Sequence, residues 1–279
     1  SEDPQTQVLL LEAGRDFTSA ETPEHIRIPN PLHAIADDNY RWPTLLARRT
    51  ALQEPRLLWR GRAIGGSSTI NGQIAIRGMP DDFNRWEQLG CVGWGWEQVL
   101  PYFCKLENDI RFGNTPYHGN SGPIPIFRAE PLDWGSVDLA LMKAGLDLDY
   151  GWCEDHNAPW GTGVSPYAIN SQSGNRVSTN DGYLEPARNR SNLTIEGNAI
   201  VDTLTFEGNR HHVNGVRVSL RGEVKSRRAN KEVLLCAGAI HSPTILQRSG
   251  FGPSSLLKSL NIPVIKELPI GKNLLDHPI

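Results

Sequence analysis

The chain has 279 residues, enough for one large domain or two ordinary ones, each with a buried core. Its formal net charge is −3 and charged residues make up 21% of it, so no basic field predicts binding to nucleic acid. No apolar run approaches the ~20 residues that cross a bilayer, which predicts no transmembrane segment. The N-terminal residues do not resemble a secretion signal.

Four cysteines, Cys91, Cys104, Cys153 and Cys236, occur in unrelated contexts without the spacing of a metal site. This pattern predicts free, buried thiols and no bound metal. Because free thiols are typical of a reducing compartment, we expect a cytoplasmic protein.

The first predicted element is a strand over residues 8–11, a continuous apolar run typical of a strand buried on both faces of a parallel sheet. It ends in Glu12. An acidic residue at the carboxyl end of such a strand is placed to accept hydrogen bonds from the ribose hydroxyls of a dinucleotide. A solvated carboxylate or a helix cap is the alternative reading of Glu12. Residues 1–7 are too few for the βα unit that normally precedes this strand, so we expect a fragment that does not retain a dinucleotide alone.

Residues 61–72 contain the adjacent glycines Gly65 and Gly66, then Ser67 and Ser68, then Asn71. Glycine lets backbone approach a flat or charged ligand closely, because it has no Cβ. We expect residues 74–76 to pack as a helix, and the hydroxyls and free amides at its start to bind an anion. The lysine and the spacing of a P-loop are absent, which argues against a nucleoside triphosphatase. The stretch therefore predicts a site for a large, partly anionic cofactor.

The middle of the chain, residues 78–190, shows helical patterns separated by glycine- and proline-rich loops. One predicted helix spans residues 81–89 and ends at Gly90, and a second spans residues 96–106, bent or divided at Pro101. A third is capped by Ser136 and runs to about residue 146. This alternation of helical patterns and loops indicates a second region inserted into a nucleotide-binding domain.

The C-terminal part begins with β-rich segments at residues 193–196, 200–206 and 213–218, with turn candidates at residues 207–209 and 221–223. These segments predict an antiparallel meander. Residues 233–239 have the character of a second buried strand. Ser242 and Pro243 then indicate the start of a helix, and Gly250 its end.

Together the elements predict an α/β fold of mixed α+β character. It comprises an incomplete Rossmann-like dinucleotide-binding domain, with a parallel sheet and a β-meander, and part of an inserted substrate domain. The expected boundaries are residues 1–77 and 191–279 for the discontinuous nucleotide-binding domain. Residues 78–190 form the region that covers the cofactor on the substrate side.

Two long motifs carry a family resemblance. Residues 61–84 resemble the first signature of the glucose–methanol–choline (GMC) flavoprotein oxidoreductases. Residues 238–252 resemble the second, with Phe251 in place of a smaller aliphatic residue and His241 in place of a common asparagine. Shorter matches follow the family's order at residues 93–103, 118–123, 176–187 and 271–277.

The resemblance implies an FAD site. Glu12 would bind the adenosine ribose, and Val201 would meet the adenine through main-chain atoms. The other residues implied to contact FAD lie in two loops: Gly65, Gly66, Ser67 and Ser68 along the pyrophosphate and the flavin edge, Asn71, Gly72, Gln73 and Ile74 at the isoalloxazine, and Ala237 and Gly238 in a turn under the cofactor. Ile70 stands where some members carry a histidine that links the flavin covalently, so we expect non-covalent FAD.

The resemblance also implies the reaction, oxidation of a small alcohol, with a base removing the hydroxyl proton and hydride passing to flavin N5. An FAD-containing lyase of the same fold and a non-catalytic binding or scaffold protein are the alternatives. The identity of the substrate, the electron acceptor and the oligomeric state are left open.

None of the chain's histidines matches the family's catalytic histidine, which would lie beyond residue 279, so no catalytic residue is predicted here. We expect His277 to be structural, His211 and His212 to be exposed near a meander turn, and His241 to belong to a strand-to-helix turn.

Overall fold

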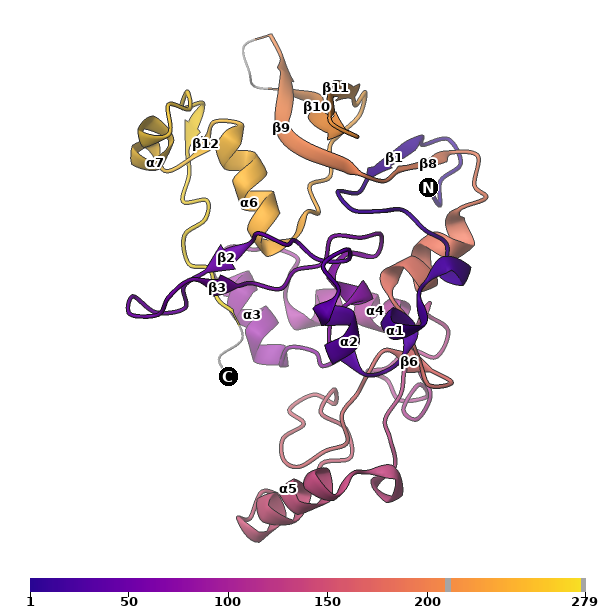
Figure 1. Ribbon diagram of the computed structural model, residues 1–279. Helices are drawn as coiled ribbons and strands as arrows, with labels where there is room; N and C mark the ends of the chain where they lie inside the picture. The colour runs from indigo at the N-terminus through magenta and orange to yellow at the C-terminus, as the bar shows by residue number, and fades with distance from the viewer. Residues whose placement is uncertain (209–211, 277–279) are drawn as a thin grey trace. The chain divides into compact units, whose positions relative to one another are not determined.

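The computed structural model describes residues 1–208 and 212–276, which divide into two compact units (Figure 1). The first unit consists of Ser1–Gln7 and Phe17–Leu193, and the second of Val8–Asp16 and Thr194–Ile279. His211, His277 and the turn residue Asn209 lie outside the described residues. The functional division at residues 77 and 191 stays a prediction. Across the described part of the chain, every helix falls short of the length and apolar character needed to cross a bilayer.

The first unit combines helices with two-stranded sheets. Its helices are α1 (Glu24–Arg27), α2 (Pro31–Ala36), α3 (Pro80–Gln88), α4 (Trp96–Leu106) and α5 (Ser136–Asp147), with short helical turns η1 (Ser19–Glu21), η2 (Gly66–Thr69), η3 (Pro131–Asp133), η4 (Asn180–Leu184) and η5 (Glu185–Ala187). Its strands pair as β2 (Leu46–Ala47) with β3 (Arg56–Leu57), β4 (Glu107–Asp109) with β5 (Ile124–Ile126), and β6 (Ser171–Gln172) with β7 (Asn175–Arg176). The β4–β5 pair is parallel and the other two are antiparallel.

Two clusters of apolar side chains hold this unit together. Ile124, Ile126 and Ala168 form a buried core against which Ala75 and Val177 pack. Between α3 and α4, the ring of Phe83 lies 5.9 Å from that of Trp96 and 5.5 Å from that of Phe103. Burial of large aromatic surfaces joins the two helices.

The predicted helices of the middle region are present, with differences at their ends. Gly90 follows α3 at φ +101°, which confirms the expected stop. Helix α4 runs without interruption across Pro101, so it is not divided there, and a bend at Pro101 stays a prediction. In α5 the residue before the helix is Gly135, and Ser136 is its first residue, so Ser136 does not cap it.

The second unit is built around the meander. Strands β9 (Ala199–Glu207), β10 (His212–Leu220) and β11 (Glu223–Arg228) form an antiparallel meander in the order β11-β10-β9. The prediction is confirmed for residues 200–206 and 213–218, but the third strand is β11 rather than residues 193–196. The β10–β11 turn consists of Arg221 and Gly222, both at positive φ, the backbone of a tight hairpin. Strand β8 (Leu193–Glu196) does not join the meander but pairs with β1 (Val8–Leu11).

The remaining elements of this unit are α6 (Gly238–Arg248), β12 (Phe251–Gly252), α7 (Ser254–Ser259) and β13 (Lys266–Glu267). Helix α6 is tied to β9 through Ser249, whose Oγ accepts a hydrogen bond from the Leu204 amide at 2.8 Å. Strands β12 and β13 form a second parallel pair. The mixed helix and sheet with parallel strands confirms the predicted fold class.

Residues 233–237 are not a buried strand, contrary to the prediction. They are irregular and mostly exposed, and no strand of the described residues pairs with them. An unpaired segment cannot satisfy its backbone groups as a strand. Helix α6 begins at Gly238, so Ser242 and Pro243 lie inside it rather than at its start.

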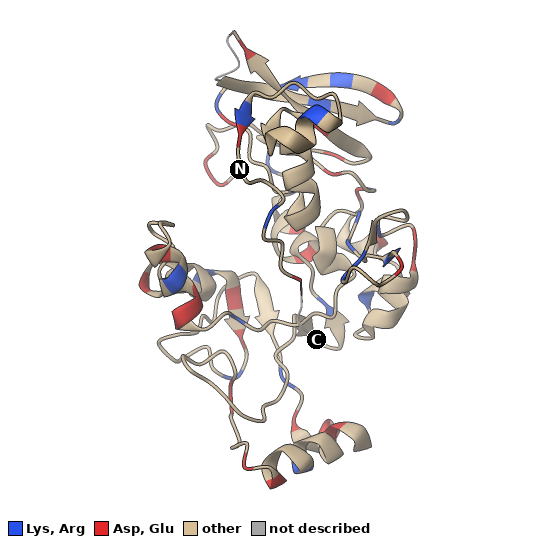
Figure 2. Ribbon diagram, turned by 90° about the vertical axis from the view of Figure 1, so that its left-hand side faces the viewer, with Lys and Arg blue, Asp and Glu red and all other residues tan. Residues whose placement is uncertain are grey.

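The cysteines are free but not buried. Cys91 and Cys236 are exposed, and Cys104 and Cys153 are partly exposed. Figure 2 shows acidic and basic residues interspersed along the ribbon, as the near-neutral composition predicts.

Candidate functional site

The glycine–serine loop, residues 61–74, forms the predicted site of the first unit. Gly65 and Gly66 adopt φ +84° and +57°, and the turn η2 follows directly. A Cβ on Gly65 would lie 2.6 Å from Thr69 Oγ1, whereas a Cβ on Gly66 would meet nothing within 4 Å. Both positions require glycine for their left-handed backbone, and Gly66 leaves open space above it.

The two serines have different surroundings. Ser68 Oγ donates to the Gly65 carbonyl at 2.6 Å and accepts from the Thr179 amide at 2.9 Å, so its hydroxyl is used inside the protein. Ser67 is exposed, and its Oγ accepts from the Gly61 amide at 3.0 Å. The Ser67 hydroxyl proton therefore stays available to an external acceptor.

Asn71 and Gln73 shape the end of the loop. Asn71 Oδ1 accepts from the Gln73 amide at 3.0 Å. Gln73 is buried at φ +62°, an uncommon backbone for a residue other than glycine. Its Nε2 donates to the Pro29 carbonyl at 2.7 Å, and its backbone carbonyl accepts from the Asn170 amide at 2.8 Å. These bonds hold the strained backbone in place.

The expected helix over residues 74–76 is absent. Instead, the backbone of this segment pairs with residues 168–169. Ile74 forms an antiparallel bridge with Ile169, and the Ala75 amide donates a hydrogen bond of 2.9 Å to the Ala168 carbonyl. Ile74 is half exposed and Gly72 is partly exposed, so both border solvent.

The other predicted residues lie in the second unit. Glu12 follows β1, is partly buried, and its Oε1 accepts from the Gly14 amide at 2.7 Å. Val201 lies on β9 opposite Val218 and is partly buried. Ala237 and Gly238 are exposed at the start of α6, where Gly238 adopts φ +83° and a Cβ would meet open space.

The histidines in the second unit differ from one another. His212, at the start of β10, is exposed as expected. His241 lies within α6 rather than in a strand-to-helix turn, because α6 begins upstream of it. Burial, together with the nearby charge of Arg248, lowers the pKa of His241.

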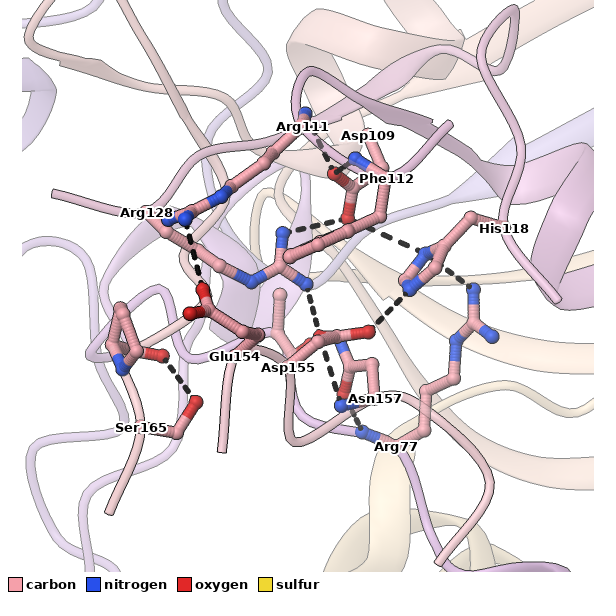
Figure 3. Close-up of polar contacts among 12 residues, drawn as sticks. Arg77, Asp109, Arg111, Phe112, His118, Arg128, Glu154, Asp155, Asn157 and Ser165 are labelled. Carbon is pink, nitrogen blue, oxygen red and sulfur yellow. Dashed lines mark hydrogen bonds and ion pairs between the residues drawn. The ribbon is translucent and has the colours of Figure 1, made fainter. Parts of the chain in front are cut away.

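A buried cluster of charged residues around His118 was not recognised from the sequence. His118 Nδ1 lies 2.5 Å from Glu107 Oε1. Its Nε2 lies 2.8 Å from Asp155 Oδ2 (Figure 3). Arg128 bridges Asp109 at 2.7 Å and Asp155 at 2.6 Å. The sequence signal was the two acidic residues Glu107 and Asp109, which lie in β4 next to the apolar strand β5, but it does not show which charges meet.

His118 is a cation in this cluster, because both ring nitrogens face carboxylates and only the imidazolium donates from both. Burial alone lowers the pKa of His118, but the hydrogen bonds to Asp155 and Glu107 outweigh it and raise this pKa above its usual value. Burial likewise raises the pKa of Asp155, yet the bond from His118 and the charge of Arg128 bring it below its usual value.

Glu107, Asp109 and His118 have the atoms of a metal site, within 4.8 Å of one another. However, Arg77 lies 2.5 Å from Glu107 and Arg128 lies 2.7 Å from Asp109. With His118 protonated, three cations (Arg77, Arg128 and His118) face three carboxylates (Glu107, Asp109 and Asp155). The arrangement favours an internal ion-pair network over a metal ion, which would meet cations already in place.

A cavity of about 310 Å³ lies in the first unit, bordered by Thr69 of this loop and by Arg176 and Asp181 among others. None of the eight site residues predicted in the glycine–serine loop lines it. This cavity is therefore not the predicted cofactor site.

Comparison with known proteins gives consistent matches. The family model for GMC oxidoreductase matches residues 17–279. Oxygen-dependent choline dehydrogenase 1 of Chromohalobacter salexigens is 40% identical over 99% of this chain and 49% of its own length. Pyridoxine 4-oxidase from Mesorbium loti is similar in structure with a TM-score of 0.87 and 33% identity, over 96% of this chain and 52% of that one.

A third match is an FAD-dependent oxidoreductase from Chaetomium thermophilum, with a TM-score of 0.83 and 28% identity over 96% of this chain and 47% of that one. The chain spans about half the length of the curated relatives it matches. Since the family model covers most of the chain and both signatures occur in order, this protein is a member of the GMC oxidoreductase family.

Proposed function

We propose that this chain binds FAD and forms part of an oxidoreductase that acts on the CH–OH group of a small alcohol. Family membership over residues 17–279 carries the proposal. Choline and pyridoxine, the compounds in the names of two similar proteins, both carry a primary alcohol. They share little else, so the substrate class is as far as the proposal goes.

The geometry of the glycine–serine loop supports the proposal that it binds FAD. The open space above Gly66 admits a flat or charged group against the backbone. The exposed hydroxyl of Ser67 is a donor for a phosphate oxygen. Ser68, by contrast, acts through its backbone or by supporting Gly65, because its hydroxyl is already bonded on both sides.

The FAD contacts proposed for the second unit are those that the resemblance to the GMC family implies. Glu12 holds the adenosine ribose and the main chain of Val201 meets the adenine. The open position at Gly238, next to Ala237, fits close approach of a cofactor. Each of these assignments is tested by substituting the residue and measuring the affinity of the variant for FAD.

FAD is proposed to be non-covalent. Ile70 occupies the position at which the resemblance expects a linking histidine, and its side chain is 2% exposed. A buried alkyl group offers neither a nucleophile nor access to a flavin. Flavin released into the supernatant after acid precipitation would support this.

When bound, FAD supplies the redox chemistry by accepting hydride from the alcohol carbon. The residues of this chain hold the cofactor: the glycine–serine loop through amides and the Ser67 hydroxyl, and Asn71 to Ile74 along the isoalloxazine. No residue of this chain is assigned as the base that takes the hydroxyl proton. Its free cysteines support the expectation of a reducing, cytoplasmic compartment.

The test uses the protein expressed from its complete gene. We expect a yellow protein whose oxidised-flavin absorbance bleaches when a substrate alcohol is added without oxygen, with choline and pyridoxine as the first two probes. Bound flavin that no alcohol in a broad panel bleaches would favour the lyase reading. A protein without flavin would overturn the proposal and favour a binding or scaffold role.

A further inference from the structure

Arg176 is bonded to the glycine–serine loop, and sequence analysis assigned it no role beyond a motif match. It ends strand β7 in the first unit and is 5% exposed. Burial lowers the pKa of its guanidinium to about 10, with a smaller opposing effect from Asp181. It therefore stays charged at neutral pH, and a charge is retained in this interior despite the cost of removing it from water.

The guanidinium is bonded to backbone on both sides. Nη1 donates to the Asn71 carbonyl at 2.7 Å and to the Ser68 carbonyl at 3.1 Å. The same nitrogen lies 3.1 Å from Asn71 Oδ1. Nε donates to the Ile26 carbonyl at 3.0 Å. One rigid, planar group thus links the end of α1 to both ends of the segment between Ser68 and Asn71.

This contact sets the direction of one peptide group at the predicted flavin site. Peptide bonds are planar and trans, so the N–H of Gly72 points opposite to the carbonyl of Asn71. Because that carbonyl points at Arg176, the Gly72 N–H points away from the guanidinium. The resemblance assigns Gly72 and Gln73 backbone contacts with the isoalloxazine.

Burying the Arg176 side chain has a free-energy cost. Arg176 Nη2 is buried, and no hydrogen-bond partner for it occurs among the described residues. Unsatisfied buried donors are rare and destabilising. An apolar side chain at this position would leave unpaired the three backbone carbonyls that Nε and Nη1 of Arg176 now bond.

We propose that Arg176 is the positioning residue of the cofactor loop: it fixes the Ser68 and Asn71 carbonyls and thereby aims the Gly72 N–H at the flavin. This inference rests on the proposed function for the flavin, but the ordering of the loop stands on the contacts alone. Arg176 itself is not a catalytic residue, because it acts through the backbone of the loop.

The test compares Arg176→Lys with Arg128→Lys in the protein expressed from its complete gene. Lysine keeps the charge but cannot reach Ile26 and the loop carbonyls together. Arg128 is a matched control, because it is also a buried arginine but its bonds go to Asp109 and Asp155. The readouts are FAD affinity, the visible circular dichroism of bound flavin, hydrogen exchange of residues 66–74, and thermal stability.

We expect Arg176→Lys to weaken FAD binding by about tenfold, the loss of roughly one charged hydrogen bond. We also expect altered flavin dichroism and faster amide exchange in the loop. Arg128→Lys should lower stability while leaving flavin affinity and dichroism at wild-type values. Wild-type affinity and dichroism in Arg176→Lys would overturn the inference.

Two further outcomes are distinguishable. If the wild-type protein binds no FAD, the proposed function fails, and hydrogen exchange alone decides the ordering role: exchange that is faster in Arg176→Lys than in Arg128→Lys supports it, and equal exchange overturns it. If Arg176→Lys does not fold, Arg176→Gln repeats the comparison without a buried unpaired charge.

Discussion

Gly61 and Gly66 lie in the same loop, but the structure requires glycine at each for a different reason. A Cβ on Gly61 would lie 2.4 Å from the Gly66 carbonyl oxygen, a backbone atom that cannot move freely. Gly66 has open space but a φ of +57°, which costs an L-residue roughly 1–2 kcal/mol. Motif inspection alone treats the two glycines alike.

We therefore expect Gly66→Ala to lower the free energy of unfolding by about 1–2 kcal/mol, and Gly61→Ala to lower it further because of the clash. Chemical denaturation of both variants measures the difference. Because the added methyl of Gly66→Ala fills the open space, we also expect it to weaken FAD binding. A Gly66→Ala protein less stable than Gly61→Ala would contradict this account.

His118 should make stability depend on pH. Its pKa is raised in the folded protein, so its contribution is fully present below the unfolded value of about 6.5. Above that pH the native state holds a proton that the unfolded state has lost, so stability falls as pH rises. The slope is at most about 1.4 kcal/mol per pH unit, and the contribution is gone above the folded pKa.

Denaturant unfolding between neutral and mildly alkaline pH measures this effect. His118→Gln is the control, since the amide can donate to one carboxylate but does not titrate. We expect the variant to be less stable at neutral pH and to lose the downward slope. The same slope in both proteins would show that another group is responsible.

At the scale of elements, helix α4 tolerates a proline in its interior. Pro101 is exposed and lies in the middle of the helix, where it removes one backbone hydrogen bond. We expect Pro101→Ala to raise the free energy of unfolding by up to about 3 kcal/mol. Gln98→Ala, at another exposed position of α4, should change it by less than about 0.5 kcal/mol. Thermal unfolding of the two variants tests this prediction. An unchanged stability of Pro101→Ala would indicate that the fold already compensates for the hydrogen bond lost at Pro101.

The elements predicted best are those specified by local chemistry. The strand over residues 8–11, the meander, and helices α3, α4 and α5 all carry their own periodicity or turn residues, and all are present. Residues 233–237 and 74–76 were mispredicted because an apolar run does not reveal its neighbours. A run becomes a strand only where another strand pairs with it, and Ile74 met Ile169 from a distant part of the chain.

At the scale of the whole molecule, FAD should stabilise the fold by mass action. A ligand at one hundred times its Kd raises the free energy of unfolding by about 2.7 kcal/mol. We expect FAD to raise the melting temperature of the protein expressed from its complete gene. Riboflavin, which lacks the pyrophosphate and adenosine, is the control and should raise it less. Equal shifts for the two ligands would argue against the roles proposed for the loop and for Glu12.

The family, the mixed class of fold and the loop at Gly65 and Gly66 could all be inferred from the residues alone, because signatures and glycine positions are local properties of the chain. The folded arrangement was needed to see which side chains meet: Ser68 is bonded to Thr179, Arg176 holds the Asn71 carbonyl, and His118 lies among three carboxylates. These contacts join residues far apart in the chain. Their energies depend on burial and distance, which no local pattern records.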